Sequence, residues 1–310
     1  MVDITIPDAK RKTIAKQYYD RLVNWIDKKV QWAIADDAMA SEMMDYIHTN
    51  SREFFLASAC RLKAKSNKFS RRFAGEKQNY DEASRDDKPA TSYGRFMRRM
   101  RDIYNGFMQD IDDEGVKNGY WLMKQLNIRV CPYCNSNYTI CIDEDTVQVR
   151  PEYDHFYPES KYPSLILSFY NLVPSCPQCN HLKRAQELKV NPWKGYNAVS
   201  VPKFMVDTSK GDFPATPKIL IKGENNNTKK LGIRELYNEH TDYVKDILNK
   251  IQAYNPATYK TIAKDFQGIV YTEAELERMI WGNYTNIGNA DKRPFAKLTA
   301  DILEQYKKYL

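Results

Sequence analysis

The stretch EYDHFYPESKYPSLILSFYNLVPSCPQCNHLK, residues 152–183, holds two of the four histidines and two of the six cysteines in a chain of 310 residues. Cys176 and Cys179 form one CxxC pair in this stretch, and Cys131 and Cys134 form another one upstream. Two such pairs are typical of a structural zinc site, because four thiolates complete a tetrahedral shell and leave no position for a substrate. We therefore expect these cysteines to hold Zn²⁺, or another thiophilic metal, and to stabilise a small module.

The composition predicts a globular protein in the cytoplasm. With 42% hydrophobic residues, the chain has enough apolar mass for one large domain or two ordinary ones. No apolar run approaches the roughly 18–20 residues of a membrane helix, and the first residues lack the apolar core of a signal peptide. In a reducing compartment, cysteines spaced as CxxC bind metals more often than they form disulfides. Cys60 and Cys141 lack a spaced partner and are expected to be buried apolar residues.

The hydrophobic pattern predicts an α+β protein that is mostly helical. Apolar residues recur at three- and four-residue steps in residues 10–60 and 93–128, whereas residues 77–92 have few apolar anchors and are expected to form an exposed loop. Two β-favouring runs at 137–143 and 146–153 predict a hairpin, and a helix is expected to begin at Pro177.

The chain after residue 194 is predicted to contain one strand at 218–222 and several helices. These helices are expected at 231–253, after a capping box formed by Thr272 and Glu275, and at 295–310. The resulting division is a helical N-terminal region (1–128), a mixed module with the cysteines (129–193) and a mainly helical C-terminal region (194–310).

Positive charge is concentrated in residues 61–101, which contain 13 lysines and arginines against 5 acidic residues. Such a block is typical either of a surface that faces phosphates or of a solvated helix face. It runs into a predicted amphipathic helix whose apolar side would dock on the core. Arg95, Arg98 and Arg99 lie on another side of this helix, and we expect them to contact a nucleic-acid backbone.

The residues between and after the cysteine pairs suit the hydrolysis of a phosphodiester bond, which needs a base for water and a cation for the developing charge. His155 can act as a base at neutral pH, and Asp154 offers a hard oxygen ligand for a magnesium-type ion. Asn180 offers a carbonyl oxygen as another ligand. Lys183 lies one helical turn further on and is expected to meet a phosphate.

The helix that follows the second cysteine pair links the two predicted metal sites. Cys176 and Cys179 would share one side of this helix, and Asn180 and Lys183 the next. Zinc would therefore anchor the helix that presents catalytic ligands. Neighbouring residues in a regular strand point to opposite faces, so Asp154 and His155 can serve one site only if the strand bends or ends there.

At these residues the sequence resembles the HNH endonuclease family, whose ββα-metal module carries a histidine on its first strand, an asparagine in a loop and a metal ligand on its helix. The resemblance rests on DHFYP, NLVPSC and CNHLK, framed by CPYCN, and covers residues 129–193. It implies that His155 is the general base, that Asp154 and Asn180 bind Mg²⁺ or Mn²⁺, and that Asn171 orients the loop and His155. His181 is an alternative to Asn180 as the metal ligand.

The wider pattern, DHFYPES with NLVPSC and NPW, is most similar to the zinc-containing HNH nucleases of bacterial anti-phage systems of the Septu and retron types. This resemblance implies a role in defence and an ATPase partner subunit. DNA is the expected substrate, and an RNase that cleaves tRNA is the alternative. A catalytically inactive, zinc-stabilised nucleic-acid-binding or adaptor protein would keep the cysteines and the basic segment but would not need Asp154, His155 and Asn180 together.

Overall fold

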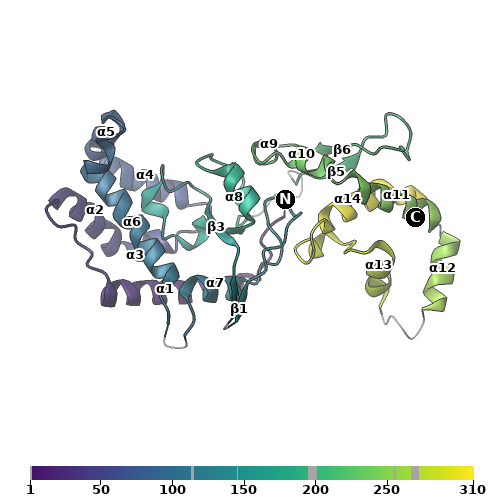
Figure 1. Ribbon diagram of the computed structural model, residues 1–310, viewed down its shortest axis with the longest axis horizontal. Coiled ribbons are helices and arrows are strands. Elements are labelled where there is room, and N and C mark those ends of the chain that lie inside the picture. The colour runs from purple at the N-terminus through teal and green to yellow at the C-terminus, as the bar shows by residue number, and fades with distance from the viewer. Residues whose placement is uncertain (1, 113–114, 145, 195–200, 255, 267–271) are drawn as a thin grey trace.

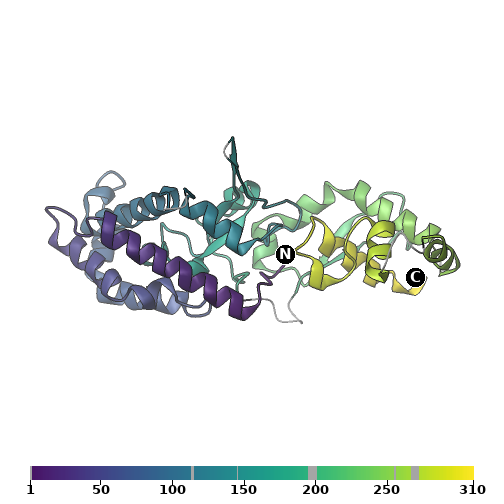
Figure 2. The same cartoon turned by 90° about the horizontal axis from the view of Figure 1, so that it is seen from below.

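A computed structural model describes residues 2–112, 115–144, 146–194, 201–254, 256–266 and 272–310. The molecule is elongated, with the N-terminal helices at one end, the C-terminal helices at the other and the cysteine-containing segment between them (Figures 1 and 2). A large cluster of buried apolar side chains includes members from all three parts of the chain.

The N-terminal region is a bundle of helices in which α6 contacts α1, α2, α5 and α7. The predicted apolar stripe is confirmed at Ile14, Tyr18, Leu22 and Ile26, which are all buried. Its expected continuation through Val30 and Ala33 is wrong, because α1 ends at Lys29 and neither residue is buried. The elements of this region are α1 (Asp8–Lys29), α2 (Ala38–Thr49), α3 (Ser51–Phe55), α4 (Leu62–Arg72), α5 (Ala74–Glu82), the 3-10 turn η1 (Lys88–Ala90), α6 (Ser92–Gln109) and α7 (Asn118–Leu126).

The loop predicted for residues 77–92 is wrong over residues 77–82, which form the last two thirds of α5. Two side-chain pairs at i,i+4 spacing, Lys77 with Asp81 and Gln78 with Glu82, support this helix in place of apolar anchors. The ring of Tyr80 on α5 packs against Tyr93 of α6. Tertiary contact therefore supplies the stabilisation that the local sequence lacks.

The middle of the chain contains two antiparallel strand pairs and one helix. The predicted hairpin is confirmed but is shorter than expected, with β1 (Ile142–Glu144) paired to β2 (Val147–Val149). Residues 137–141 lie outside it, and residues 152–153 belong to the next strand. The second pair joins β3 (Glu152–His155) to β4 (Leu172–Ser175), with Asp154 opposite Val173 and His155 opposite Leu172. Between these strands lie the 3-10 turns η2 (Pro163–Leu165) and η3 (Phe169–Asn171), and α8 (Pro177–Lys183) follows β4 and contacts β3.

The C-terminal region contains one strand pair and six helices among the described residues. The predicted strand at 218–222 is confirmed as β6, and Thr272 and Glu275 form the predicted capping box. The elements are β5 (Lys203–Val206), β6 (Ile219–Lys222), α9 (Asn226–Lys230), α10 (Ile233–Asn238), α11 (Thr241–Ala253), α12 (Pro256–Asp265), α13 (Glu273–Trp281), η4 (Ile287–Asn289), α14 (Ala296–Gln305) and η5 (Lys307–Tyr309).

The C-terminal region is fastened to the first cysteine pair through Asn135, which is fully buried. The Asn135 side chain donates to the carbonyl of Ala290 at 2.7 Å and accepts from the Lys297 N–H at 3.0 Å. The backbone carbonyl of Asn135 accepts from the Phe295 N–H at 2.7 Å. The hydroxyl of Tyr237 donates to the Cys134 carbonyl at 2.7 Å. The CPYCN segment thus positions the C-terminal region as well as its own thiols.

The architecture agrees with the predicted mixture of many helices and small sheets, with helices predominant. Each sheet among the described residues has two strands, so none of them forms a layer of its own. None of the described helices is both long enough and apolar enough to span a bilayer.

Candidate metal centre and active site

The four cysteines of the two CxxC pairs come together in the structure. Their sulfur atoms lie within 4.8 Å of one another, all four residues are buried, and Sγ of Cys134 is 3.9 Å from Sγ of Cys176. Zn–S bonds of about 2.3 Å in a tetrahedron place sulfur atoms about 3.8 Å apart. The cluster therefore has the dimensions of a structural zinc site, and these residues could hold the ion.

Donors around the cluster suit thiolates. The Ser136 N–H donates to Sγ of Cys134 at 3.4 Å, and the Asn137 side-chain amide donates to Sγ of Cys176 at 3.5 Å. Burial raises the pKa of the Cys131 thiol, so charged sulfurs in this place need a cation between them.

The other two cysteines are not the buried apolar residues that the sequence suggested. Cys60 is exposed and its Sγ lies 3.3 Å from the Ser58 hydroxyl, while Cys141 is only partly buried. Cys60 sits in the turn before α4, and Cys141 immediately precedes the exposed hairpin. Cys60 therefore faces solvent, whereas Cys141 packs against the edge of the main apolar cluster without being fully buried.

A pocket of about 420 Å³ lies at the end of β3, and residues of α6 and α8 complete its walls. Its lining includes Asp154, His155 and Asn180. The two neighbours on β3 reach one pocket because the strand ends at His155, where the chain turns away. Three of the residues predicted from the sequence are thus brought together in space.

Asp154 is buried and held by two donors. The Tyr133 hydroxyl donates to its Oδ2 at 2.6 Å, and the Lys183 ammonium donates to its Oδ1 at 2.9 Å. A carboxylate has about four lone-pair positions, so these two bonds leave capacity for a metal ion. Tyr133 belongs to the CPYC motif, which connects the cysteine cluster directly to this carboxylate.

The hydrogen bond of His155 determines its tautomer. Nε2 lies 3.0 Å from the carbonyl oxygen of Ile166, and because a carbonyl only accepts, Nε2 carries the hydrogen. Nδ1 is then the nitrogen with a free lone pair. Burial lowers the pKa of His155 below its ordinary value of 6.5, which keeps the imidazole neutral at pH 7. A neutral imidazole with an open Nδ1 can accept a proton.

Asn180 presents its carbonyl oxygen rather than its amide nitrogen. The side-chain nitrogen donates to Oε2 of Glu152 at 2.7 Å, which leaves Oδ1 available as a ligand. The alternative ligand, His181, is exposed, lies 2.9 Å from the Arg184 guanidinium, and is not part of the pocket lining. The pocket therefore favours Asn180 over His181.

Lys183 does not lie where a phosphate contact would need it. Its side chain has no exposed surface, and besides Asp154 it donates to the His155 carbonyl at 2.6 Å. The expected phosphate contact is therefore wrong for this side chain, because its charge is used inside the protein. Lys183 instead ties α8 to the two pocket residues at the end of β3.

Asn171 joins the two ends of the loop that follows His155. Its side chain accepts from the Tyr157 N–H at 2.8 Å and donates to the carbonyls of Tyr157 and Leu165, both at 3.1 Å. Its backbone carbonyl accepts from the Phe156 N–H at 2.8 Å. The fully buried amide thus fixes the loop that carries Ile166, the hydrogen-bond partner of His155.

Further pocket residues did not stand out in the sequence. The ring of Tyr104 on α6 packs edge-on against His155 with centroids 4.8 Å apart, and burial raises the pKa of this tyrosine. Glu159, in the loop after His155, pairs with Arg101 of α6 at 2.8 Å. The sequence showed that Tyr104 shares a helix with the arginines. It gave no sign that this ring contacts a histidine 51 residues later.

Arg184 also lines the pocket and has an unusual backbone. It follows the last residue of α8 with φ 45° and ψ −127°, a region that side chains other than glycine rarely adopt. Strained residues of this kind concentrate at functional sites. Arg184 is exposed at this pocket, whereas the neighbouring Lys183 is fully buried.

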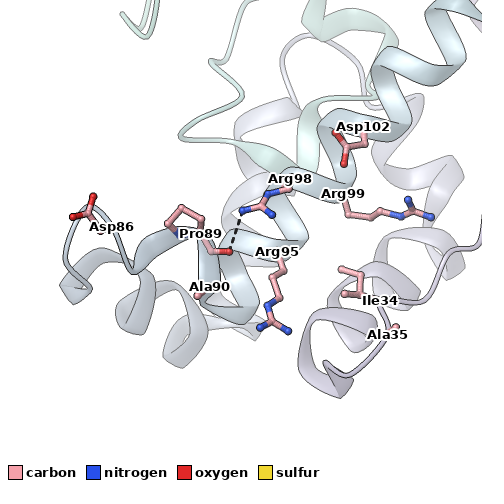
Figure 3. Close-up of a pocket in the computed structure, with 9 residues that line it drawn as sticks. All are labelled: Ile34, Ala35, Asp86, Pro89, Ala90, Arg95, Arg98, Arg99 and Asp102. Carbon is pink, nitrogen blue, oxygen red and sulfur yellow. Dashed lines mark hydrogen bonds between the residues drawn. The ribbon is translucent and has the colours of Figure 1, made fainter.

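The three arginines of α6 line a second pocket, which is open to solvent (Figure 3). Arg95 and Arg99 extend toward the segment before α2, and Arg98 donates to the Pro89 carbonyl at 3.5 Å. Arg95 also lies 3.6 Å from Asp37. The structure thus gathers these side chains around one cavity that is separate from the pocket of His155.

Part of the chain is similar to the Septu protein PtuB of Bacillus thuringiensis. The two sequences are 36% identical over 62 residues, which amount to 20% of this chain and 22% of that protein. The match therefore spans about a fifth of the length of this curated relative. No family model and no solved structure matches the chain. These comparisons indicate kinship for a part of the chain with a protein named for the Septu system.

Proposed function

We propose that this protein is a metal-dependent endonuclease of the HNH type that hydrolyses phosphodiester bonds, with DNA as its substrate. In this proposal β3, the loop held by Asn171, β4 and α8 form a ββα-metal module. The observation that carries the proposal is that Asp154, His155 and Asn180 line one pocket, which Tyr133 and α8 connect to the four-cysteine cluster.

His155 is the general base. Its Nδ1 takes the proton of a water molecule, and the water oxygen attacks phosphorus in line with the leaving oxygen. The Ile166 carbonyl keeps the hydrogen on Nε2 and so keeps Nδ1 free. Because burial lowers the pKa of His155, the base is already neutral at pH 7.

Asp154 and Asn180 would hold Mg²⁺ or Mn²⁺ through oxygen atoms, which are the ligands that such ions prefer. The bound ion would supply positive charge to the phosphate and to the leaving 3′-oxygen, so that the products end in 5′-phosphate and 3′-hydroxyl. Lys183 and Tyr133 hold the Asp154 carboxylate in place through their hydrogen bonds. The exposed Arg184 offers a guanidinium to a phosphate at the pocket.

Zinc bound by the four cysteines would act as a structural support. Cys176 occupies the N-cap position of α8, and Cys179 lies within this helix. The same helix carries Asn180 and Lys183. The first cysteine pair carries Tyr133, which binds Asp154. Binding of zinc would therefore fix both the helix and the carboxylate that face the pocket.

The biological role we propose is defence against phage, with the protein working in the cytoplasm beside a partner subunit. The similarity to the Septu protein PtuB supports this role. An ATPase is the proposed partner, on the basis of the wider sequence pattern described above. Such a partner would restrain or direct the nuclease.

The proposal is tested by incubating the purified protein with plasmid DNA and with total tRNA in Mg²⁺, Mn²⁺ or EDTA. We expect metal-dependent cutting of DNA that is lost in His155→Ala, while zinc remains at about one ion per chain. Preferential cutting of tRNA would replace DNA by RNA as the substrate. Absence of cutting with zinc present, even with a Septu-type ATPase and ATP added, would favour an inactive nucleic-acid-binding protein.

A further inference from the structure

The second pocket is a cavity of about 540 Å³ in the N-terminal region (Figure 3). One wall is the α6 turn with Arg95, Arg98 and Arg99, and the opposite walls come from the segment before α2 and from η1. Its volume exceeds the 420 Å³ of the pocket at His155 and falls in the range of small-molecule sites, roughly 300–1,000 Å³. The nuclease mechanism uses none of its residues.

The positive charge in this pocket is held in position without being fully neutralised. A guanidinium nitrogen of Arg99 donates to the Gln31 carbonyl, and one of Arg98 donates to the Pro89 carbonyl at 3.5 Å. These backbone acceptors orient the two side chains from opposite walls but carry no net charge. Among the described residues, Arg95 alone of the three has a carboxylate partner, Asp37, at the longer distance of 3.6 Å. The cavity therefore keeps an attraction for anions.

Arg99 has a second feature that points to a ligand. Its Nε is buried, and no atom of the described residues accepts a hydrogen bond from it. A buried donor without an acceptor is costly, about 1–3 kcal/mol, and the large majority of buried polar groups in native proteins have a partner in the protein or an ordered water. An anion that draws the Arg99 guanidinium toward the pocket would give this donor an acceptor.

The rest of the lining differs from a simple anion site. Ile34 and Ala35 form an apolar surface on one side, and Pro89 and Ala90 form another on η1. Asp86 lies beyond Pro89, away from the three guanidinium groups, in Figure 3. Asp102 lies one turn after Arg98 on α6 and also lines the pocket. Apolar walls with carboxylates at the margin suit a ligand that carries an anionic end, hydroxyl groups and a flat apolar part.

We infer that this pocket binds a nucleotide. The phosphates lie against Arg95 and Arg99, with charge-assisted hydrogen bonds from the guanidinium groups. The base lies over Pro89 and Ala90, and a carboxylate accepts from a ribose hydroxyl or a base amine. The nucleotide comes either free from solution or as the phosphorylated end of a strand. This inference goes beyond the proposed nuclease function, since it requires no cleavage at His155.

The test measures binding to the full-length, zinc-loaded protein by calorimetry, in EDTA-free buffer without Mg²⁺ so that no strand is cut. The probes are ATP, tripolyphosphate, and a short single-stranded oligonucleotide with either a 5′-phosphate or a 5′-hydroxyl. The variants are Arg95→Gln/Arg99→Gln, which removes the charge, and Ala90→Trp, which fills the apolar end from an exposed position. Arg71→Gln, on an exposed arginine of α4 outside the pocket, is the matched control.

We expect the wild type and Arg71→Gln to bind ATP or the 5′-phosphorylated strand, and the double arginine variant to bind at least tenfold more weakly. Ala90→Trp should also weaken binding, and tripolyphosphate should bind less tightly than the nucleotide. Stronger binding of ATP identifies a free nucleotide, and stronger binding of the phosphorylated strand identifies a strand end. The inference is overturned if no probe binds at millimolar concentration, if the arginine variant binds like wild type, or if tripolyphosphate binds as well as ATP and Ala90→Trp has no effect.

Discussion

Replacing Lys183 by methionine tests whether this residue stabilises the fold as half of a buried ion pair or binds a phosphate of the substrate. In the structure the Lys183 ammonium lies 2.9 Å from Oδ1 of Asp154, and the two side chains are 0% and 3% exposed. Removing one partner of a buried ion pair leaves the other charge unpaired, which typically costs about 3–5 kcal/mol. The variant also loses the 2.6 Å hydrogen bond to the His155 carbonyl. We therefore expect Lys183→Met to lower the free energy of unfolding by about 3 kcal/mol or more.

The assay is unfolding in urea of the zinc-loaded protein, followed by circular dichroism, beside a cleavage assay. Lys16→Met is the matched control, because Lys16 pairs with Asp20 on the surface, where the side chains are 67% and 51% exposed. Lys16→Met should lower the free energy of unfolding by less than about 1 kcal/mol. A phosphate-binding Lys183 would give the opposite pattern, with lost cleavage and unchanged stability. An unfolding free energy within about 0.5 kcal/mol of wild type would refute the buried-pair assignment.

Four further changes test the rest of the site. Asn180→Ala should abolish metal-dependent cleavage while His181→Ala leaves most of it, and equal losses in both would contradict the choice of Asn180 from the pocket lining. Arg184→Gly should remove the strain of the positive φ at this residue and raise the free energy of unfolding in urea by about 1 kcal/mol, while cleavage falls. A lower free energy of unfolding would show that the backbone at this position is not strained. Asn135→Ala should lower the unfolding free energy by about 2 kcal/mol or more, because it orphans buried backbone groups of the C-terminal region, and a change below about 0.5 kcal/mol would argue against that junction. Single-turnover cleavage should be constant near pH 7 and fall at acid pH as His155 is protonated, with its midpoint below 6.5 because burial lowers this pKa; a midpoint above 7 would contradict the buried, neutral base.

Local spacing accounts for the parts of the site that were predicted correctly. Cys176 and Cys179 lie within one turn of chain, as do the two cysteines of CPYC, so each pair could be assigned to one metal site from sequence. The neighbours Asp154 and His155 were expected to share a site only if the strand stopped there, and β3 does end at His155. These relationships depend on residues a few positions apart, which the sequence specifies directly.

Long-range packing accounts for what the sequence did not reveal. The burial of Lys183 depends on Asp154, 29 positions earlier, and the orientation of His155 depends on the carbonyl of Ile166. No propensity or periodicity encodes these pairings. The same holds for α5, which was predicted as a loop because its stabilising contacts with α6 lie outside its own segment.

The arginines of α6 show how a correct pattern can lead to an incomplete interpretation. Their helical spacing correctly placed Arg95, Arg98 and Arg99 away from the apolar face. The enclosing walls come from the segments before α2 and at η1, which the sequence analysis did not connect with α6. A basic helix face and an arginine-lined cavity have the same local pattern but suit different ligands.

The most direct test of the account is chemical rescue of the proposed base. His155→Gly is compared with wild type in single-turnover cleavage of DNA with Mg²⁺ or Mn²⁺, with and without added imidazole, and bound zinc is measured in the same samples. The account predicts that the variant retains zinc, cleaves at least 100-fold more slowly, and recovers activity as imidazole is added, because the missing group is a proton acceptor. Wild-type rates in the variant without imidazole would contradict the assignment of His155 as the general base.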